Sequence, residues 1–318
     1  MVRFFLFLVF VLAAVDGLVF TSALNRQLHR QKNTIVLNAA LKSQLTKLVA
    51  GHDLTTAETE EAWDKILQGC DPAAVGALLL LLRAKGETPT EIAGMVKAMK
   101  KACNPVVVDG KLLDIVGTGG DGADTINIST ASVVLAAACG CKVAKAGNRS
   151  VSSRCGSADV LETLGVQIEL NPEQVAESIE KCGIGFMYAP VNHPAMRTVA
   201  PIRKALGVRT AFNILGPMTN AAGAQHAVIG VFEESLVDLL ANTLMEVGNI
   251  EHGVVVTGCG LDEISPLGPS SIFEIKNIAG PGLPKSYETK RLSFNNCIVG
   301  QTRTTLVNYY PLSIQVSF

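Results

Sequence analysis

Aromatic residues and net charge are both scarce in this sequence. Only 5% of its 318 residues are aromatic, and the formal net charge is −1. Platforms that stack single-stranded bases depend on aromatic side chains, and nucleic-acid binding leaves a basic patch or stripe. The composition therefore argues against nucleic acid as a partner. Its length and its 48% hydrophobic residues are enough for one or two globular domains with a buried core. Small molecules are therefore the expected ligands.

Closely paired cysteines are also missing, because the eight cysteines include no C-x-x-C motif. Several lie inside apolar runs, where a thiol behaves as a small hydrophobic group. Cys139 and Cys141 are separated by a single residue, which is too close for an ordinary zinc finger. This usage predicts a reducing compartment rather than a disulfide framework.

Residues 1–36 differ in composition from the rest and are expected to form a targeting leader. Arg3 precedes an apolar run at residues 4–15, which is short for a membrane span but suits a secretory signal. Residues 17–52 contain no acidic residue, as in organelle transit peptides. A signal followed by a transit-like stretch indicates a plastid, with the secretory pathway as the alternative. No stable membrane insertion is expected after the leader is removed.

Residues 37–105 have the apolar spacing of four short helices and no strand pattern. Leucines recur at positions 41, 45 and 48, and a threonine pair at 55 and 56 precedes acidic residues that favour a helix start. Pro72 and Pro89 mark two further helix starts. These features predict a small N-terminal helical domain.

Residues 106–294 alternate short strands with polar loops and helices. The apolar runs at 111–117, 141–147, 227–232 and 252–258 are predicted strands, and apolar helices are predicted between them. This alternation predicts a larger, mostly parallel α/β domain, with some helices returning to the small domain. Ligands of such sheets bind at the carboxyl ends of the strands.

Two polar loops that follow predicted strands are suited to phosphate. The first, "GTGGDGADTINIST", combines glycines with a helix start, and the second, "KAGNRSVSS", supplies Lys145, Arg149 and hydroxyl groups. The first loop also matches G-x-G-x-x-G. A dinucleotide site would need an acidic residue about 20 positions later, where this chain is cationic. Taken singly, a capped glycine turn and a basic surface turn remain alternative interpretations.

Two further segments carry charge in apolar surroundings. Arg203 and Arg209 lie in "APIRKALGVRTAFNILGPMTN", where a guanidinium suits a planar carboxylate or, alternatively, local backbone carbonyls. Asp262 and Glu263 follow the strand at 252–258 and suit Mg²⁺ that also contacts substrate phosphates. A solvated acidic turn is the alternative for this pair. His193 is expected to be structural.

Four segments together resemble the anthranilate phosphoribosyltransferase family of tryptophan biosynthesis. They are "GTGGD", "KAGNRSVSS", "HPAMRTVAPIRKALGVRTAFNILGP" and "LDEISPLGPSSIFEI", and the likeness runs in order from about residue 41 to about residue 288. The resemblance implies a nucleoside phosphorylase or phosphoribosyltransferase-like fold that is paired as a homodimer through its helical domain. It also implies transfer of the phosphoribosyl group of 5-phosphoribosyl 1-pyrophosphate to anthranilate, with two Mg²⁺ ions.

The resemblance further implies roles by position. The residues expected to hold phosphoribosyl pyrophosphate are Gly117, Gly120, Asp121, Thr125, Asn127, Ser129, Thr130, Lys145, Asn148, Arg149, Ser150, Val151, Ser152, Ser153 and Ser157. Those expected to bind the metal are Ser129, Asp262 and Glu263, and those for anthranilate are Gly117, Asn148 and Arg203. No side chain is expected to act as a strong acid or base, because catalysis would consist of positioning and electrostatics.

The chain departs from the family pattern in two places. Ala146 stands where the family usually has a histidine, so anthranilate affinity is expected to differ. Residues 295–318 do not match the family and are expected to be an atypical, truncated end. Two alternatives therefore stay open: a non-catalytic truncated paralogue that binds phosphoribosyl pyrophosphate, and an enzyme like pyrimidine nucleoside phosphorylase.

Overall fold

The computed structural model describes residues 41–123, 126–150, 155–279 and 283–294. The expected leader and the atypical end lie outside the described residues, and so do Thr125 and residues 151–153 of the predicted site. Across the described ranges, none of the helices has both the length and the apolar character needed to cross a bilayer.

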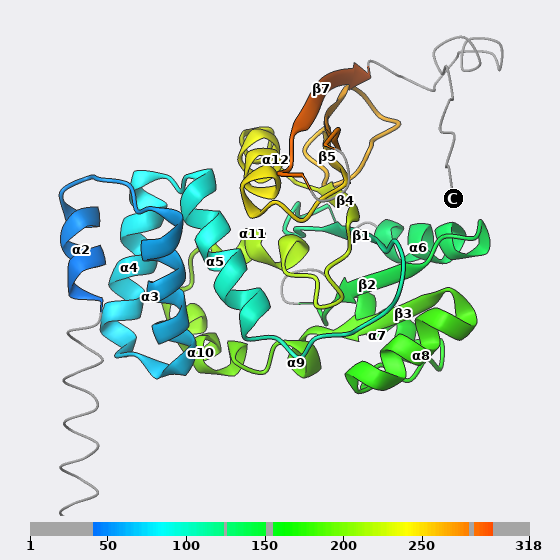
Figure 1. Ribbon diagram of the computed structural model, residues 1–318, viewed down its shortest axis with the longest axis horizontal. Coiled ribbons are helices and arrows are strands. Elements are labelled where there is room, and N and C mark those ends of the chain that lie inside the picture. The colour runs from blue at the N-terminus through cyan, green and yellow to red at the C-terminus, as the bar shows by residue number, and fades with distance from the viewer. Residues whose placement is uncertain (1–40, 124–125, 151–154, 280–282, 295–318) are drawn as a thin grey trace, which may run out of the picture.

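Four helices form a bundle at one end of the described chain (Figure 1): α2 (Lys42–Val49), α3 (Thr56–Gly69), α4 (Pro72–Lys85) and α5 (Pro89–Lys101). Thr55 and Thr88 each close a capping box at the start of a helix, and Asp71 caps α4 directly before its first-turn proline. The four predicted helices are therefore confirmed, together with the local signals that start three of them.

Seven strands form one sheet in the order β3-β2-β1-β4-β5-β6-β7. The strands are β1 (Leu113–Gly117), β2 (Val143–Gly147), β3 (Ile184–Tyr188), β4 (His226–Gly230), β5 (His252–Gly258), β6 (Ser270–Asn277) and β7 (Tyr287–Phe294). The first five in this order are parallel, and β6 and β7 add antiparallel pairs at one edge. The prediction of a helical unit followed by a mostly parallel sheet is thus confirmed, although β3, β6 and β7 were not predicted.

The remaining helices connect these strands or return to the bundle. They are α6 (Ile128–Ala138), α7 (Ser157–Thr163), α8 (Pro172–Cys182), α9 (Ala189–Asn192), α10 (Met196–Leu206), α11 (Phe212–Leu215) and α12 (Ser235–Val247), with a 3₁₀ turn at Gly216–Met218. Helix α10 packs against α3 and α4, while α12 contacts both α5 and the strands β5 and β6. The bundle and the sheet are therefore joined by packed helices as well as by the chain.

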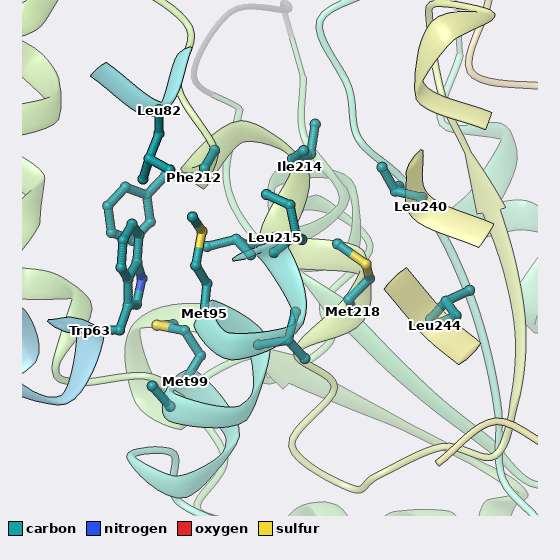
Figure 2. Packing of buried hydrophobic residues seen from close by; sticks show 14 of the residues in the cluster. Trp63, Leu82, Met95, Met99, Phe212, Ile214, Leu215, Met218, Leu240 and Leu244 are labelled. Carbon is teal, nitrogen blue, oxygen red and sulfur yellow. The ribbon is translucent and has the colours of Figure 1, made fainter. Parts of the chain in front are cut away.

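One hydrophobic core runs from the bundle to the sheet. Figure 2 shows Trp63 of α3 beside Phe212 of α11, and their ring centroids are 5.4 Å apart. The same cluster continues through Leu215 to Leu240 and Leu244 of α12. Because α11 is buried in this core, the loop that precedes it is held in a defined position beside the sheet.

The cysteines in the described part of the chain are all free thiols. The seven are half-buried or exposed, and none forms a disulfide with another described cysteine. This agrees with the absence of a disulfide framework expected from the sequence.

Candidate active site

Asp262, in the loop after β5, lies against the glycine-rich loop after β1. Its Oδ2 accepts a hydrogen bond from the Gly119 N–H at 2.8 Å. A Cβ at Gly117 or at Gly230 would collide with Asp262, so the close approach requires glycine at both positions. Gly117 and Gly230 pair directly across β1 and β4. The acidic pair and the glycine-rich loop therefore share one edge of the sheet.

Three carboxylates, those of Asp121, Asp262 and Glu263, influence one another electrostatically at this edge. Burial raises the pKa of Asp262, and the nearby charge of Asp121 adds to the effect. Burial, followed by the charges of Asp262 and Asp121, raises the pKa of Glu263 to about 7. A divalent cation would relieve this repulsion, so the donor set fits Mg²⁺. In the described residues no group of three His, Cys, Asp or Glu could hold a metal unaided, so phosphate or water oxygens would complete its shell.

Lys145 connects the two loops that the sequence predicts to bind phosphate, the glycine-rich loop after β1 and the loop after β2, which we call the phosphate-type loops. It is 2% exposed, and its Nζ donates to the Ile115 carbonyl at 2.9 Å and to the Ser129 Oγ at 3.4 Å. Burial lowers the pKa of Lys145, whereas the charges of Asp114 and Glu263 favour its protonated form. The ammonium group thus lies among β1, the start of α6 and the acidic pair. Thr130, which follows Ser129 on α6, is also buried.

The glycine-rich loop is held from outside by Arg209. Gly120 has a φ of +83°, a left-handed conformation that glycine adopts without steric cost. Its carbonyl accepts a hydrogen bond from the Arg209 Nη2 at 2.5 Å. The Arg209 guanidinium also stacks on the Phe232 ring, 4.2 Å from the centroid. Of the two partners that the sequence allowed for these arginines, a ligand carboxylate or a backbone carbonyl, Arg209 therefore has the second.

The second loop is tied to α7 by its own polar groups. Arg149 contacts both carboxylate oxygens of Glu162 at 2.6 and 2.9 Å, and Asp159 at 3.2 Å. Ser157 donates to the Asn148 carbonyl at 3.3 Å. The guanidinium of Arg149 is thus engaged by α7 rather than free, and its role toward phosphate stays a prediction.

Asn127 links the end of the glycine-rich loop to the start of α7, because its Nδ2 donates to the Gly156 carbonyl at 3.2 Å. Nearby, the Ser150 N–H donates to the Asp159 carboxylate at 3.0 Å. The predicted site residues thus form two connected groups. The structure brings together Gly117, Gly120, Asp121, Ser129, Lys145, Asp262 and Glu263 in one, and Asn127, Asn148, Arg149, Ser150 and Ser157 in the other.

Arg203 lies on α10, in the segment that returns to the bundle. It is half-buried, and its guanidinium lies 5.3 Å from the centroid of the Phe212 ring. Burial lowers the pKa of Arg203, and no carboxylate of the described residues forms an ion pair with it. A guanidinium of this kind is suited to a carboxylate ligand. His193, by contrast, has its Nε2 2.9 Å from the Thr219 carbonyl, as expected of a structural histidine.

Sequence reasoning missed two buried polar residues beneath the loops. Asp114 on β1 is 1% exposed and Asn220 is 6% exposed. The Asn220 Nδ2 donates to the Asp114 Oδ2 at 2.7 Å and to the Ala144 carbonyl at 2.8 Å. An aspartate inside the apolar strand "LLDIVG" was the available signal, since a buried carboxylate needs partners.

Two family models match the chain in succession. The helical bundle domain of the glycosyl transferase family matches residues 42–103, and the a/b domain of that family matches residues 109–296. The second match alone covers more than half of the chain, and its start coincides with the approach to β1.

Relatives named anthranilate phosphoribosyltransferase are similar to this chain. The one from Methanosarcina acetivorans is 52% identical over 239 residues, which are 74% of this chain and 64% of the relative. The chain thus spans less than two thirds of that relative's length.

Two solved structures are similar over most of the chain. The crystal structure of anthranilate phosphoribosyltransferase from Thermus thermophilus has a TM-score of 0.72 and 44% identity, covering 81% of this chain and 75% of that one. The Saccharomyces cerevisiae protein, in complex with PRPP and Mg, has a TM-score of 0.70 and 29% identity, covering 80% and 72%. The chain therefore belongs to the glycosyl transferase family that includes these anthranilate phosphoribosyltransferases.

Proposed function

We propose that this chain transfers the phosphoribosyl group of 5-phosphoribosyl 1-pyrophosphate to the amine of anthranilate, giving N-(5-phosphoribosyl)anthranilate and pyrophosphate. The observation that carries the proposal is the contact of Asp262 with the glycine-rich loop at Gly117 and Gly119. Lys145 of β2 places its ammonium group against Ser129 at the start of α6. Together with the Asp262 contact, it gives one sheet edge both the amides and the charges that a diphosphate needs.

The residues of the chain would act by positioning. Amides of the glycine-rich loop and Lys145 would hold the diphosphate, and Arg203 would orient the anthranilate carboxylate. Asp262, Glu263 and Ser129 would hold Mg²⁺, which when bound neutralises the leaving pyrophosphate. The oriented amine would then attack C1 of the ribose with inversion. The departing pyrophosphate or water would accept the amine proton, so no strong base is required.

Two Mg²⁺ ions are proposed because the charges of three carboxylates, Asp121, Asp262 and Glu263, act on one another at the site. Asp121 acts on the pKa values of both Asp262 and Glu263, so negative charge is spread over two neighbouring positions. The yeast relative is in complex with PRPP and Mg, which supports magnesium as the metal.

The activity is tested directly by mixing the full-length chain with anthranilate, phosphoribosyl pyrophosphate and Mg²⁺. Anthranilate fluorescence should decay as the product forms. Replacing Arg203 with Gln should raise the KM for anthranilate about tenfold or more, since a charged hydrogen bond is lost. The KM of the Arg203→Gln variant for phosphoribosyl pyrophosphate should stay unchanged. Turnover of a pyrimidine nucleoside with phosphate would instead favour the phosphorylase, and donor binding without turnover would favour a non-catalytic paralogue.

A homodimer is proposed to form through the helical part of the molecule. An apolar groove of about 530 Å³ lies between α4 and α10, and its lining includes Pro72, Leu80, Pro201 and Leu206. Leu80 is 43% exposed, which is high for a leucine on a packed helix. Light scattering should give twice the mass of the chain for the parent protein, and half that value for Leu80→Glu. A monomeric parent protein would refute the proposal.

We also propose that residues 1–36 direct the chain to a plastid. The basic, acid-free stretch after the apolar run supports this interpretation. A fluorescent protein fused behind residues 1–36 should accumulate in plastids of a plastid-bearing cell, whereas secretion of the fusion would favour the alternative.

A further inference from the structure

Strands β1 and β2 do not pair like their neighbours. Within their described residues, they share one register pair, Leu113 with Val143, whereas β1 with β4 and β2 with β3 each share five. A regular parallel ladder would continue with Ile115 donating to the Ala144 carbonyl and accepting from the Ala146 N–H. Both of these backbone hydrogen bonds are replaced.

Side chains satisfy three of the four backbone groups of the interrupted ladder. The Asp114 Oδ1 accepts a hydrogen bond from the Ala146 N–H at 3.3 Å. Lys145 donates to the Ile115 carbonyl, and Asn220 donates to the Ala144 carbonyl. The two strands are therefore bridged by buried side chains at the ends that lead into the two phosphate-type loops.

The bridge is itself anchored away from the site. The Asn220 Oδ1 accepts from the N–H groups of Ala222 at 2.9 Å and Ala224 at 3.4 Å, which fixes which end of the amide faces Asp114. Its Nδ2 then serves Asp114 and Ala144 together. With Asp114 and Asn220 both buried, neither can exchange these partners for water without cost.

We propose that Asp114 and Asn220 are positioning residues that hold β1 and β2 apart, so that the glycine-rich loop and the Lys145 loop enclose one diphosphate. This inference rests on the proposed function, since it deepens the account of donor binding at that site. A continuous ladder would join the two strands by backbone hydrogen bonds up to Gly117 and Gly147 and so bring the two loops closer together.

Isosteric variants separate this role from stability. Asp114→Asn places an amide NH₂ against the Asn220 Nδ2, so that two donors meet, and Asn220→Asp places two carboxylates together. The reciprocal double variant restores one donor–acceptor pair. The matched control is Glu91→Gln, because Glu91 is also a fully buried carboxylate that accepts backbone N–H groups, but it lies in the bundle.

The measurements are KM for Mg²⁺-phosphoribosyl pyrophosphate, KM for anthranilate, calorimetric donor affinity and Tm, all on the full-length protein. Asp114→Asn and Asn220→Asp should each weaken donor binding about tenfold or more, with anthranilate KM changed less than about threefold. The double variant should bind the donor more tightly than Asn220→Asp. Glu91→Gln should lower Tm and leave both KM values unchanged. If Asp114→Asn and Asn220→Asp do not fold, Asn220→Ser replaces them, because it removes the side-chain bridge without introducing a charge.

The outcomes distinguish the two proposals. Donor binding by the parent protein together with unchanged affinity in Asp114→Asn or Asn220→Ser would overturn the positioning role alone. A parent protein that binds no donor would remove the proposed function and, with it, this inference.

Discussion

Asp262 occupies the space that a side chain at Gly117 would need. The carboxylate reaches the Gly119 N–H at 2.8 Å because neither Gly117 nor Gly230 carries a Cβ. The loop after β5 and the loop after β1 therefore fold directly onto each other. The electrostatic site depends on this contact, since it places the acidic pair beside the amides of the glycine-rich loop.

Replacing Gly117 with Ala should weaken donor binding about tenfold to a hundredfold, because the new methyl group must displace Asp262. Calorimetric titration of the donor in the presence of Mg²⁺ measures the effect. Gly216→Ala is the matched control, because a Cβ there meets no atom within 4 Å and the backbone is helical. Equal affinities of the two variants would contradict the packing described.

The raised pKa of Glu263 makes metal binding sensitive to pH. Because this pKa is about 7, protons compete with Mg²⁺ at and below neutrality. The Kd for Mg²⁺ should therefore rise as the pH falls from 8 to 6, by up to about tenfold per unit once the pH is below the pKa. Titrations of Mg²⁺ at several pH values in the parent protein and in Glu263→Gln check this. The variant should bind Mg²⁺ more weakly and lose most of the pH dependence.

Arg209 should matter for the donor rather than for the fold. Lysine keeps the charge but loses the stacking on Phe232 and the geometry of the bond to Gly120. Arg209→Lys should raise the KM for phosphoribosyl pyrophosphate about threefold to tenfold. Arg197→Lys, at an exposed position of α10, is the control. A change in Tm without a change in this KM would assign Arg209 a structural role only.

Lys100 should limit the stability of the protein at neutral pH. Burial lowers its pKa from 10.5 to about 8, so the folded protein holds a costly charge below pH 8. Between pH 8 and 10.5 the unfolded chain binds more protons than the folded one, so stability rises with pH in that window. Lys100→Met should thus stabilise the protein at pH 7 by up to about 3 kcal/mol, a gain that fades toward pH 10.

Denaturant unfolding of Lys100→Met at several pH values measures this gain. Lys101→Met is the control, since Lys101 is exposed and pairs with Asp64 at 2.6 Å. If both variants changed the free energy of unfolding equally and independently of pH, the lowered pKa assigned to Lys100 would be contradicted.

Local signals explain what could be predicted from the sequence. The threonine caps at 55 and 88 act on N–H groups three residues away, so helix starts in the bundle can be read directly. The glycine-rich loop, Lys145 and the acidic pair follow predicted strands, and parallel strands bring their carboxyl ends to one edge.

Longer-range relationships explain what the sequence did not reveal. Asp114 and Asn220 are 106 residues apart, and nothing local to either residue names the other. Strand β3 is a five-residue apolar run that cannot be told from a buried helical segment by periodicity. The engagement of Arg149 by Glu162 was hidden for a similar reason, because it depends on where α7 begins beside the loop.

Calorimetric titration of phosphoribosyl pyrophosphate into the full-length chain, with and without Mg²⁺, tests most directly whether both loops and the acidic pair form one donor site. The account predicts one site per chain that requires Mg²⁺ and is strongly weakened in both Lys145→Met and Glu263→Gln. Binding that is unaffected by Mg²⁺ and by both substitutions would contradict it.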